Sequence, residues 1–138
     1  MSDCIFCKII NGDIPGHIIY ENAHVRAFLD ISQTTKGHVL VVPKTHAVDI
    51  FEMTPESMSH VFSVVPKLAT ALKKAFQCDG INIVNNNGEV AGQTVFHYHV
   101  HLIPRYPDDH FHIQFPNNMS DYTENDFANL KEVIINEL

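Results

Sequence analysis

The sequence lacks an apolar run long enough to cross a membrane, and its first residues show no signal-peptide pattern. It has only nine Lys and Arg against 16 Asp and Glu, which gives a formal net charge of -7. A protein that holds duplex nucleic acid on a broad cationic face needs clustered Lys and Arg, so we expect no such partner. Cysteines are few and odd in number, three. These absences predict a cytoplasmic protein with reduced thiols and no membrane partner.

The apolar pattern predicts one α+β domain over residues 1–138, with an antiparallel sheet of about five strands, one long helix and a short C-terminal helix. The long helix begins with Thr54 as cap residue and Pro55 at its first position, followed by apolar residues at spacings of three and four. Thr123 is the expected cap of the short helix. We expect strands over 18–20, 25–29, 38–43, 80–86 and 97–103. Residues 105–138 form a C-terminal extension whose role the sequence does not define.

A C-x-x-C motif, Cys4 to Cys7, stands near the start of the chain. This spacing occurs in zinc sites and in redox pairs. A redox pair of the thioredoxin kind needs a strand before the motif, but only three residues precede Cys4. Metal binding is therefore favoured over redox chemistry, and two unremarkable thiols remain the alternative.

Three histidines alternate with apolar residues in the stretch His97–Ile103. In a strand, side chains point to opposite faces with period two, so His97, His99 and His101 are expected on one face. Neighbouring imidazoles of this set would stand about 6.6 Å apart at the backbone, close enough for two of them to share a metal ion. The outer two would be about 13 Å apart, so a single metal takes at most two of the three. Apart from metal binding and a nucleophilic role, the histidines could simply be surface residues of an edge strand.

A nucleophilic role does not require the three imidazoles to converge on one point, as a shared metal does. The central imidazole would attack an electrophile while its neighbours orient the substrate. Phosphorus suits this chemistry, because imidazole and amide donors can stabilise the charge on its oxygens. Gln93 and Thr94 stand just before the histidines as candidate donors, and Asp30 lies at the end of a predicted strand, where binding groups often occur.

The histidine stretch resembles the motif of the histidine triad (HIT) family, in which three histidines alternate with apolar residues. Residues 86–93 resemble the Asn- and Gly-containing loop that precedes this motif in the Hint-like branch. The similarity to bacterial Hint-like proteins covers residues 4–10, 28–31, 37–46 and 85–104.

The resemblance implies a nucleotidyl hydrolase or transferase that acts at the α-phosphate of purine nucleoside 5′-phosphoramidates or dinucleoside polyphosphates. It makes His99 the nucleophile of a covalent nucleotidyl-histidine intermediate, without a catalytic metal. His101 and His38 would complete the histidine cluster, and Asp30 would bind the ribose hydroxyls. The remaining substrate-binding positions implied are Phe6, Phe28 and Ile31 for the base and Asn86, Gln93 and Thr94 for the phosphate or the leaving group.

The resemblance also implies a structural zinc site and a homodimer. The zinc ligands would be Cys4, Cys7, His46 and His97, which removes His97 from the chemistry. Pairing of two copies through the long helix and the fourth strand is expected. Two alternatives stay open: a zinc hydrolase that uses the histidine triad as its ligands, and a non-catalytic module that binds nucleotides or a partner. Arg105 stays ambiguous between a phosphate contact and a surface charge.

Overall fold

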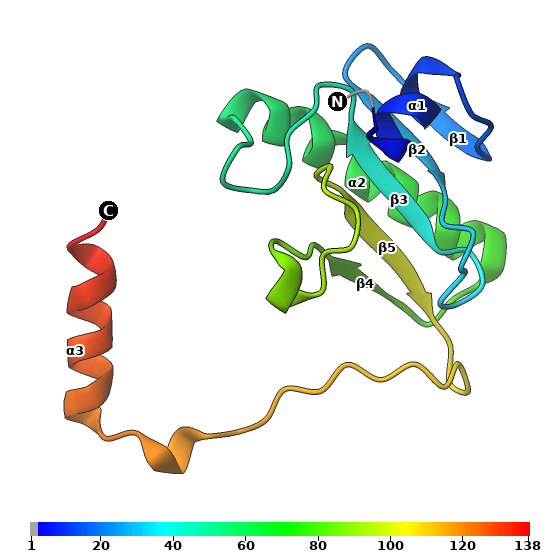
Figure 1. Cartoon of the computed structure of the whole chain (residues 1–138). Helices are drawn as coiled ribbons and strands as arrows, with labels where there is room; N and C mark the ends of the chain where they lie inside the picture. Colours follow the sequence, from blue (N-terminus) through cyan, green and yellow to red (C-terminus); the bar gives the residue numbers. More distant parts are fainter. Residues whose placement is uncertain (1–2) are drawn as a thin grey trace.

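A computed structural model describes residues 3–138 (Figure 1). Its helices are α1 (Ile5–Asn11), α2 (Pro55–Phe76) and α3 (Glu124–Ile135), with two short 3-10 helices at Glu89–Ala91 and Met119–Asp121. Its strands are β1 (Ile18–Glu21), β2 (Val25–Leu29), β3 (Val39–Pro43), β4 (Gly80–Val84) and β5 (Val100–Arg105). They form one antiparallel sheet in the order β1-β2-β3-β5-β4. The predicted α+β class, the five strands and the two predicted helices are confirmed.

Three local predictions differ from the structure. Helix α1 was not expected; it begins at its cap residue Cys4 and ends at Gly12, whose left-handed backbone (φ 82°) accommodates the turn. The fourth strand ends at Val84 rather than at residue 86. The last strand begins only at Val100, so His97 and His99 lie in the segment before it.

The two faces of the sheet carry different helices. Helix α2 covers one face, because its apolar stripe packs against buried side chains of β2, β3 and β5. Its N-terminus is capped as predicted, with the Thr54 hydroxyl accepting from the Ser57 N–H at 3.1 Å. On the opposite face a smaller cluster joins α1 to β2 and β3; its buried members are Phe6, Phe28, Leu40 and Val42. This second face holds the histidines.

Beyond β5 the chain leaves the sheet as an extended segment and ends in α3, which stands apart from the rest of the molecule (Figure 1). Every residue from 112 to 138 is exposed. Thr123 and Asp126 form a reciprocal capping box, which confirms the predicted cap of α3.

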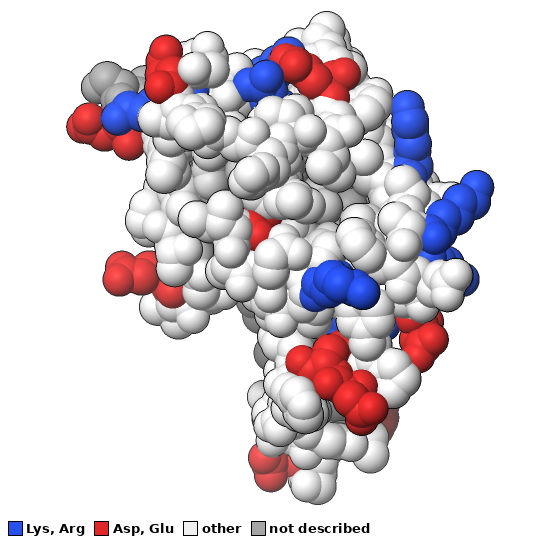
Figure 2. Space-filling model, turned by 90° about the vertical axis from the view of Figure 1, so that its right-hand side faces the viewer, with Lys and Arg blue, Asp and Glu red and all other residues white. Residues whose placement is uncertain are grey.

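On the face shown in Figure 2, several Lys and Arg side chains lie along the right-hand side, and most of the face carries neither Lys nor Arg. Within residues 3–138, none of the helices combines the length and the apolar character that a membrane crossing requires.

Candidate active site and metal centre

The histidine stretch does not have the geometry expected from a regular strand. The Tyr98 N–H donates to the Ala47 carbonyl at 2.7 Å, and the Asn85 side chain donates to the His99 carbonyl at 3.0 Å, so these residues are tied to neighbouring loops before β5 begins. The rings of His99 and His101 remain close, with centroids 5.0 Å apart. His97 and His99 precede the regular ladder. The three rings nevertheless lie on one side, as predicted, because Phe6 packs against both His97 (6.0 Å) and His99 (5.1 Å) and His99 lies beside His101.

His97 is directed toward the two cysteines near the start of the chain. Its Nε2 is 2.8 Å from the Pro43 carbonyl, which can only accept, so Nε2 carries the hydrogen and Nδ1 is left with its lone pair. That Nδ1 lies 3.4 Å from Cys4 Sγ, 3.5 Å from Cys7 Sγ and 3.2 Å from His46 Nδ1. Burial lowers the pKa of His97 to about 4, which keeps this ring neutral near pH 7.

The four side chains predicted as zinc ligands therefore meet at one point. Their ligand atoms all lie within 4.8 Å of one another. A tetrahedral zinc ion with two nitrogen and two sulfur ligands implies separations of about 3.3 Å between the nitrogens and about 3.6 Å between nitrogen and sulfur. The cysteine pair, His46 and His97 are far apart in the sequence, but the fold brings their ligand atoms to nearly these separations. The Cys7 N–H also donates to Cys4 Sγ at 3.3 Å, which holds the first ligand in place.

His99 is the buried imidazole at the centre of the site. Its Nδ1 is 2.7 Å from the His97 carbonyl, so Nδ1 is the protonated nitrogen and Nε2 keeps its lone pair. Its ring packs edge-on against Phe6, with centroids 5.1 Å apart. Burial lowers its pKa below the ordinary value. The result is a neutral imidazole with one fixed tautomer and an available nitrogen.

A chain of hydrogen bonds fixes the other two imidazoles. The Thr34 N–H donates to His38 Nδ1 at 3.3 Å, so the hydrogen of the neutral His38 ring is on Nε2. His38 Nε2 is 2.9 Å from His101 Nδ1 and donates to it. The hydrogen of His101 is therefore on its own Nε2, where it is available as a donor. The Asp30 carboxylate lies 3.6 Å from His38 Nε2 and stabilises this arrangement.

The three imidazoles of the cluster are neutral near pH 7, whereas Asp30 is ionised. Burial, together with the neighbouring rings of His99 and His38, lowers the pKa of His101 to about 4. Burial also lowers the pKa of His38, although the Asp30 carboxylate opposes the shift. Burial alone would raise the pKa of Asp30, but hydrogen bonds from Ser32 hold it below its usual range. Near neutral pH the cluster therefore combines neutral imidazoles with one carboxylate.

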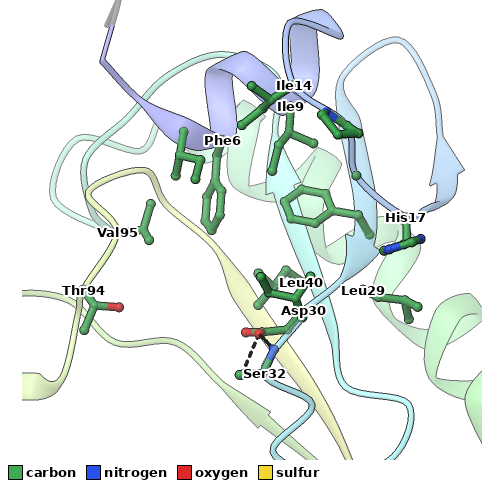
Figure 3. Close-up of a pocket in the computed structure, with 15 residues that line it drawn as sticks. Phe6, Ile9, Ile14, His17, Leu29, Asp30, Ser32, Leu40, Thr94 and Val95 are labelled. Atoms are coloured by element: carbon green, nitrogen blue, oxygen red, sulfur yellow. Dashed lines mark hydrogen bonds between the residues drawn. The ribbon is translucent and has the colours of Figure 1, made fainter.

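A mainly apolar pocket of about 480 Å³ opens next to Phe6, whose ring packs against His99 (Figure 3). Side chains of α1 form one side of it, while Leu40 and Asp30 come from the sheet and its edge on the opposite side. The Asp30 carboxylate accepts hydrogen bonds from the Ser32 N–H at 2.8 Å and the Ser32 hydroxyl at 2.6 Å. The pocket contains five of the predicted substrate-binding residues: Phe6, Phe28, Asp30, Ile31 and Thr94. Ile31 lies largely exposed, at the protein surface.

A second pocket, of about 550 Å³, lies against the histidine cluster. His38, His101 and Asn86 line it, so the structure places Asn86 with the histidines as predicted from the sequence. Residues of the extended C-terminal segment complete its wall: Phe111, Ile113 and Phe115. Sequence reasoning missed this wall, although its period-two alternation of apolar residues was a signal.

Gln93 was predicted to bind the phosphate or the leaving group, but its side chain makes hydrogen bonds within the protein. It is buried, its Nε2 donates to the Val48 carbonyl at 2.6 Å, and its Oε1 accepts from the Gly88 N–H at 2.8 Å. These bonds hold the loop between β4 and the histidine stretch in shape. Arg105 also has a structural role, because it donates to Asp109 at 2.7 Å and to Asn82 at 2.6 Å.

Residues 11–108 match the family model of the HIT domain. The chain belongs to the HIT family. Full-length similarity extends to Bacillus subtilis, where the relative named "Protein hit" is 51% identical over 99% of this chain and 94% of its own length. The HIT relative from Schizosaccharomyces pombe is named adenosine 5′-monophosphoramidase and is 45% identical over 74% of each chain.

Solved HIT structures have the same fold. A HIT family protein from Bacillus anthracis superposes with a TM-score of 0.96 at 54% identity, over 99% of this chain and 98% of that one. A protein from Streptococcus mutans superposes with a TM-score of 0.94 at 51% identity, over 99% of this chain and 86% of that one. A zinc-bound histidine triad family protein from Mycobacterium smegmatis gives a TM-score of 0.77 at 36% identity, over 96% of this chain and 98% of that one.

Proposed function

We propose that this HIT protein is a nucleotidyl hydrolase or transferase. Its substrates are purine nucleoside 5′-phosphoramidates or dinucleoside polyphosphates, attacked at the α-phosphate. The observation that carries the proposal is the His99 ring, in which a backbone carbonyl fixes the hydrogen on Nδ1 and leaves the lone pair of Nε2 for attack. The name of the Schizosaccharomyces pombe relative supports the phosphoramidate class.

The chemistry needs two displacements at phosphorus. In the first, the lone pair of His99 Nε2 forms a bond to phosphorus, and the bond from phosphorus to the leaving nitrogen or oxygen breaks. In the second, water attacks phosphorus and releases a proton to solvent, and the bond to Nε2 breaks and returns its electron pair to His99. His101 Nε2–H serves as a donor to the phosphate oxygens or to the leaving group, which stabilises charge in both transition states.

The two pockets near the histidines suit the two parts of such a substrate. The apolar pocket takes the base between Phe6, Phe28 and Ile31, and the Asp30 carboxylate accepts from the ribose hydroxyls. Ser32 keeps this carboxylate ionised and oriented. Asn86 lines the second pocket and Thr94 lines the apolar pocket, and in this proposal they contact the leaving group and the phosphate.

We assign a structural zinc ion to Cys4, Cys7, His46 and His97. Two thiolates and two neutral imidazoles with these spacings form the closed N/S ligand set that zinc takes in structural sites, and the Mycobacterium smegmatis relative is zinc-bound. The alternative zinc hydrolase is less well supported. In the part of the chain that the structure describes, the triad histidines fall into separate groups, with His97 beside the cysteines and His101 beside His38 and Asp30.

The decisive experiment is a search for the covalent intermediate. Brief incubation with adenosine 5′-phosphoramidate, acid quenching and mass spectrometry should detect adenylate on His99. The His99→Ala variant should show no adduct and at least a thousandfold lower turnover, whereas the control variant His60→Ala, altered at a surface histidine of α2, should keep both. Tight nucleotide binding without adduct or turnover in the wild type would instead support the non-catalytic module.

A further inference from the structure

The antiparallel ladder between β4 and β5 ends just short of His99. Its last pair is Val84 with His101, and β5 itself begins at Val100. A backbone carbonyl that leaves a ladder still needs a hydrogen-bond donor. The His99 carbonyl finds one in the Asn85 side chain, whose Nδ2 donates to it at 3.0 Å. A side chain therefore takes the place of a neighbouring strand at this residue.

Asn85 is itself held by a second asparagine. Asn87 Nδ2 donates to Asn85 Oδ1 at 2.6 Å, and the Ile50 N–H donates to Asn87 Oδ1 at 2.7 Å. Ile50 lies in the loop between β3 and α2, which also carries the metal-ligand candidate His46. Asn85 and Asn87, called the asparagine pair below, therefore connect this loop to the backbone of His99.

The hydrogen bonds of the asparagine pair can run in only one direction. A backbone N–H can only donate, so Asn87 must turn its oxygen toward Ile50 and its Nδ2 toward Asn85. Asn85 must accept from that Nδ2, which directs its own Nδ2 toward His99. The His99 carbonyl can only accept, so both ends of the chain of bonds agree. An obligatory donor and an obligatory acceptor thus fix both amide orientations, and each bond polarises the next.

We propose that Asn85, oriented by Asn87, is a positioning residue for the attack of His99 on phosphorus; this inference rests on the proposed function. The His99 carbonyl accepts from Asn85, and the His99 ring donates through Nδ1–H to the His97 carbonyl, so one short segment carries both bonds that set the ring. Without the Asn85 bond this segment is free to rotate, and Nε2 moves out of line with the bond that must break. A misplacement of about 1 Å costs roughly a hundredfold in rate.

The first test compares two full-length variants. Asn85→Leu removes the donor to His99 without adding charge. Asn22→Leu is the control: it removes a side chain in the turn between β1 and β2, whose Oδ1 accepts from the N–H groups of His24 at 2.8 Å and Val25 at 2.9 Å. Asn85→Leu should lower kcat about tenfold to a hundredfold with little change in KM, because the apolar pocket is lined by other elements. The control should lower the Tm but leave kcat and KM unchanged.

Asn87→Asp tests the orientation of the amides without altering Asn85 or His99. The carboxylate still accepts from the Ile50 N–H but has no hydrogen to give to Asn85 Oδ1, so the Asn85 amide should flip and turn its oxygen toward the His99 carbonyl. We expect kcat to fall as in Asn85→Leu. Within residues 3–138 the lining of the second pocket includes Asn85 but not Asn87. A fall confined to Asn85→Leu would therefore indicate direct contact of Asn85 with substrate and would overturn the proposal, as would unchanged kcat in both variants.

Nitrogen NMR of the His99 ring separates this proposal from the proposed function. In the wild type and the control we expect a single tautomer, with the hydrogen on Nδ1 and slow exchange of that hydrogen with water. In Asn85→Leu and Asn87→Asp this exchange should be at least about tenfold faster, because the segment opens more often. If the wild type forms no adduct, the proposed function fails, and unchanged exchange in both variants would then overturn the role of the asparagine pair as well. If Asn85→Leu does not fold, Asn87→Asp and the control carry the test.

Discussion

At the scale of single residues, backbone carbonyls make chemically equal imidazoles unequal. The Pro43 carbonyl accepts a hydrogen bond from His97 Nε2–H, and the His97 carbonyl accepts one from His99 Nδ1–H. One ring therefore offers Nδ1 to the cysteines, and the other offers Nε2 to a substrate. Position in the motif does not decide these tautomers; the acceptor nearest each ring does.

The lowered imidazole pKa values predict an unusual acid limb for the activity. A nucleophilic His99 must be neutral, and burial holds its pKa below the ordinary imidazole value of 6.5. As the pH falls through 6.5 the ring stays neutral, so the acid limb of kcat/KM should lie below pH 6.5. A pH profile of kcat/KM between 4 and 8 checks this. An acid limb centred at 6.5 would contradict it.

At the scale of elements, the turn before β3 positions His38 between Asp30 and His101. Gly37 has a φ of 95°, a left-handed conformation, and a Cβ at this position would lie 2.7 Å from the Phe76 ring. The turn is therefore packed against the end of α2. The sequence motif of alternating histidines does not include this turn, although His38 depends on it.

Replacement of this glycine should be costly. Gly37→Ala combines a left-handed backbone with a clash against the partly buried Phe76 ring, so we expect a loss of about 1–3 kcal/mol in the free energy of unfolding. The control is Gly80→Ala in β4, where an added Cβ meets nothing within 4 Å and the backbone is not left-handed. Urea denaturation of both variants measures the difference. Equal stability of the two would show that the turn adapts without strain.

At the scale of the whole molecule, the metal cluster joins parts of the chain that are far apart in sequence. Cys4 and Cys7 belong to α1 and its cap, whereas His46 and His97 come from the segments after β3 and before β5. Phe6, which lies between the two cysteines, packs against His99 and lines the apolar pocket. A metal at this cluster would therefore hold one wall of the pocket.

Removal of zinc should loosen this wall. Protein purified without chelator should contain about one zinc per chain by elemental analysis, and chelation should lower the Tm. Cys7→Ser should lose most of the zinc, whereas Cys78→Ser, which alters the buried thiol beyond α2, should retain it. The apo protein should still form some adduct on His99, because His99 is not a ligand. Alkylation of both thiols in metal-free protein as purified would refute the site.

By itself the sequence determined the α+β class, the two capped helices, the four metal-ligand candidates and His99 as the candidate nucleophile. The class and the helices follow from hydrophobic period and cap residues, whereas the four ligand candidates and the role of His99 follow from the resemblance to the HIT family. The structure changed the setting of the motif. His97 and His99 precede β5 rather than forming part of it, and Gln93 holds a loop.

Only the tertiary structure decided which nitrogen of each ring is free, how the cysteines meet His46 and His97, and that Phe111–Phe115 border the pocket at His101. Each depends on atoms that are remote in sequence and come together through packing of α1 and the sheet. Helix α3 is a further example, since the spacing of its apolar residues is evident from the sequence but its position away from the sheet is not. Periodicity specifies that a face will be buried, but the partner that buries it depends on the arrangement of the whole chain.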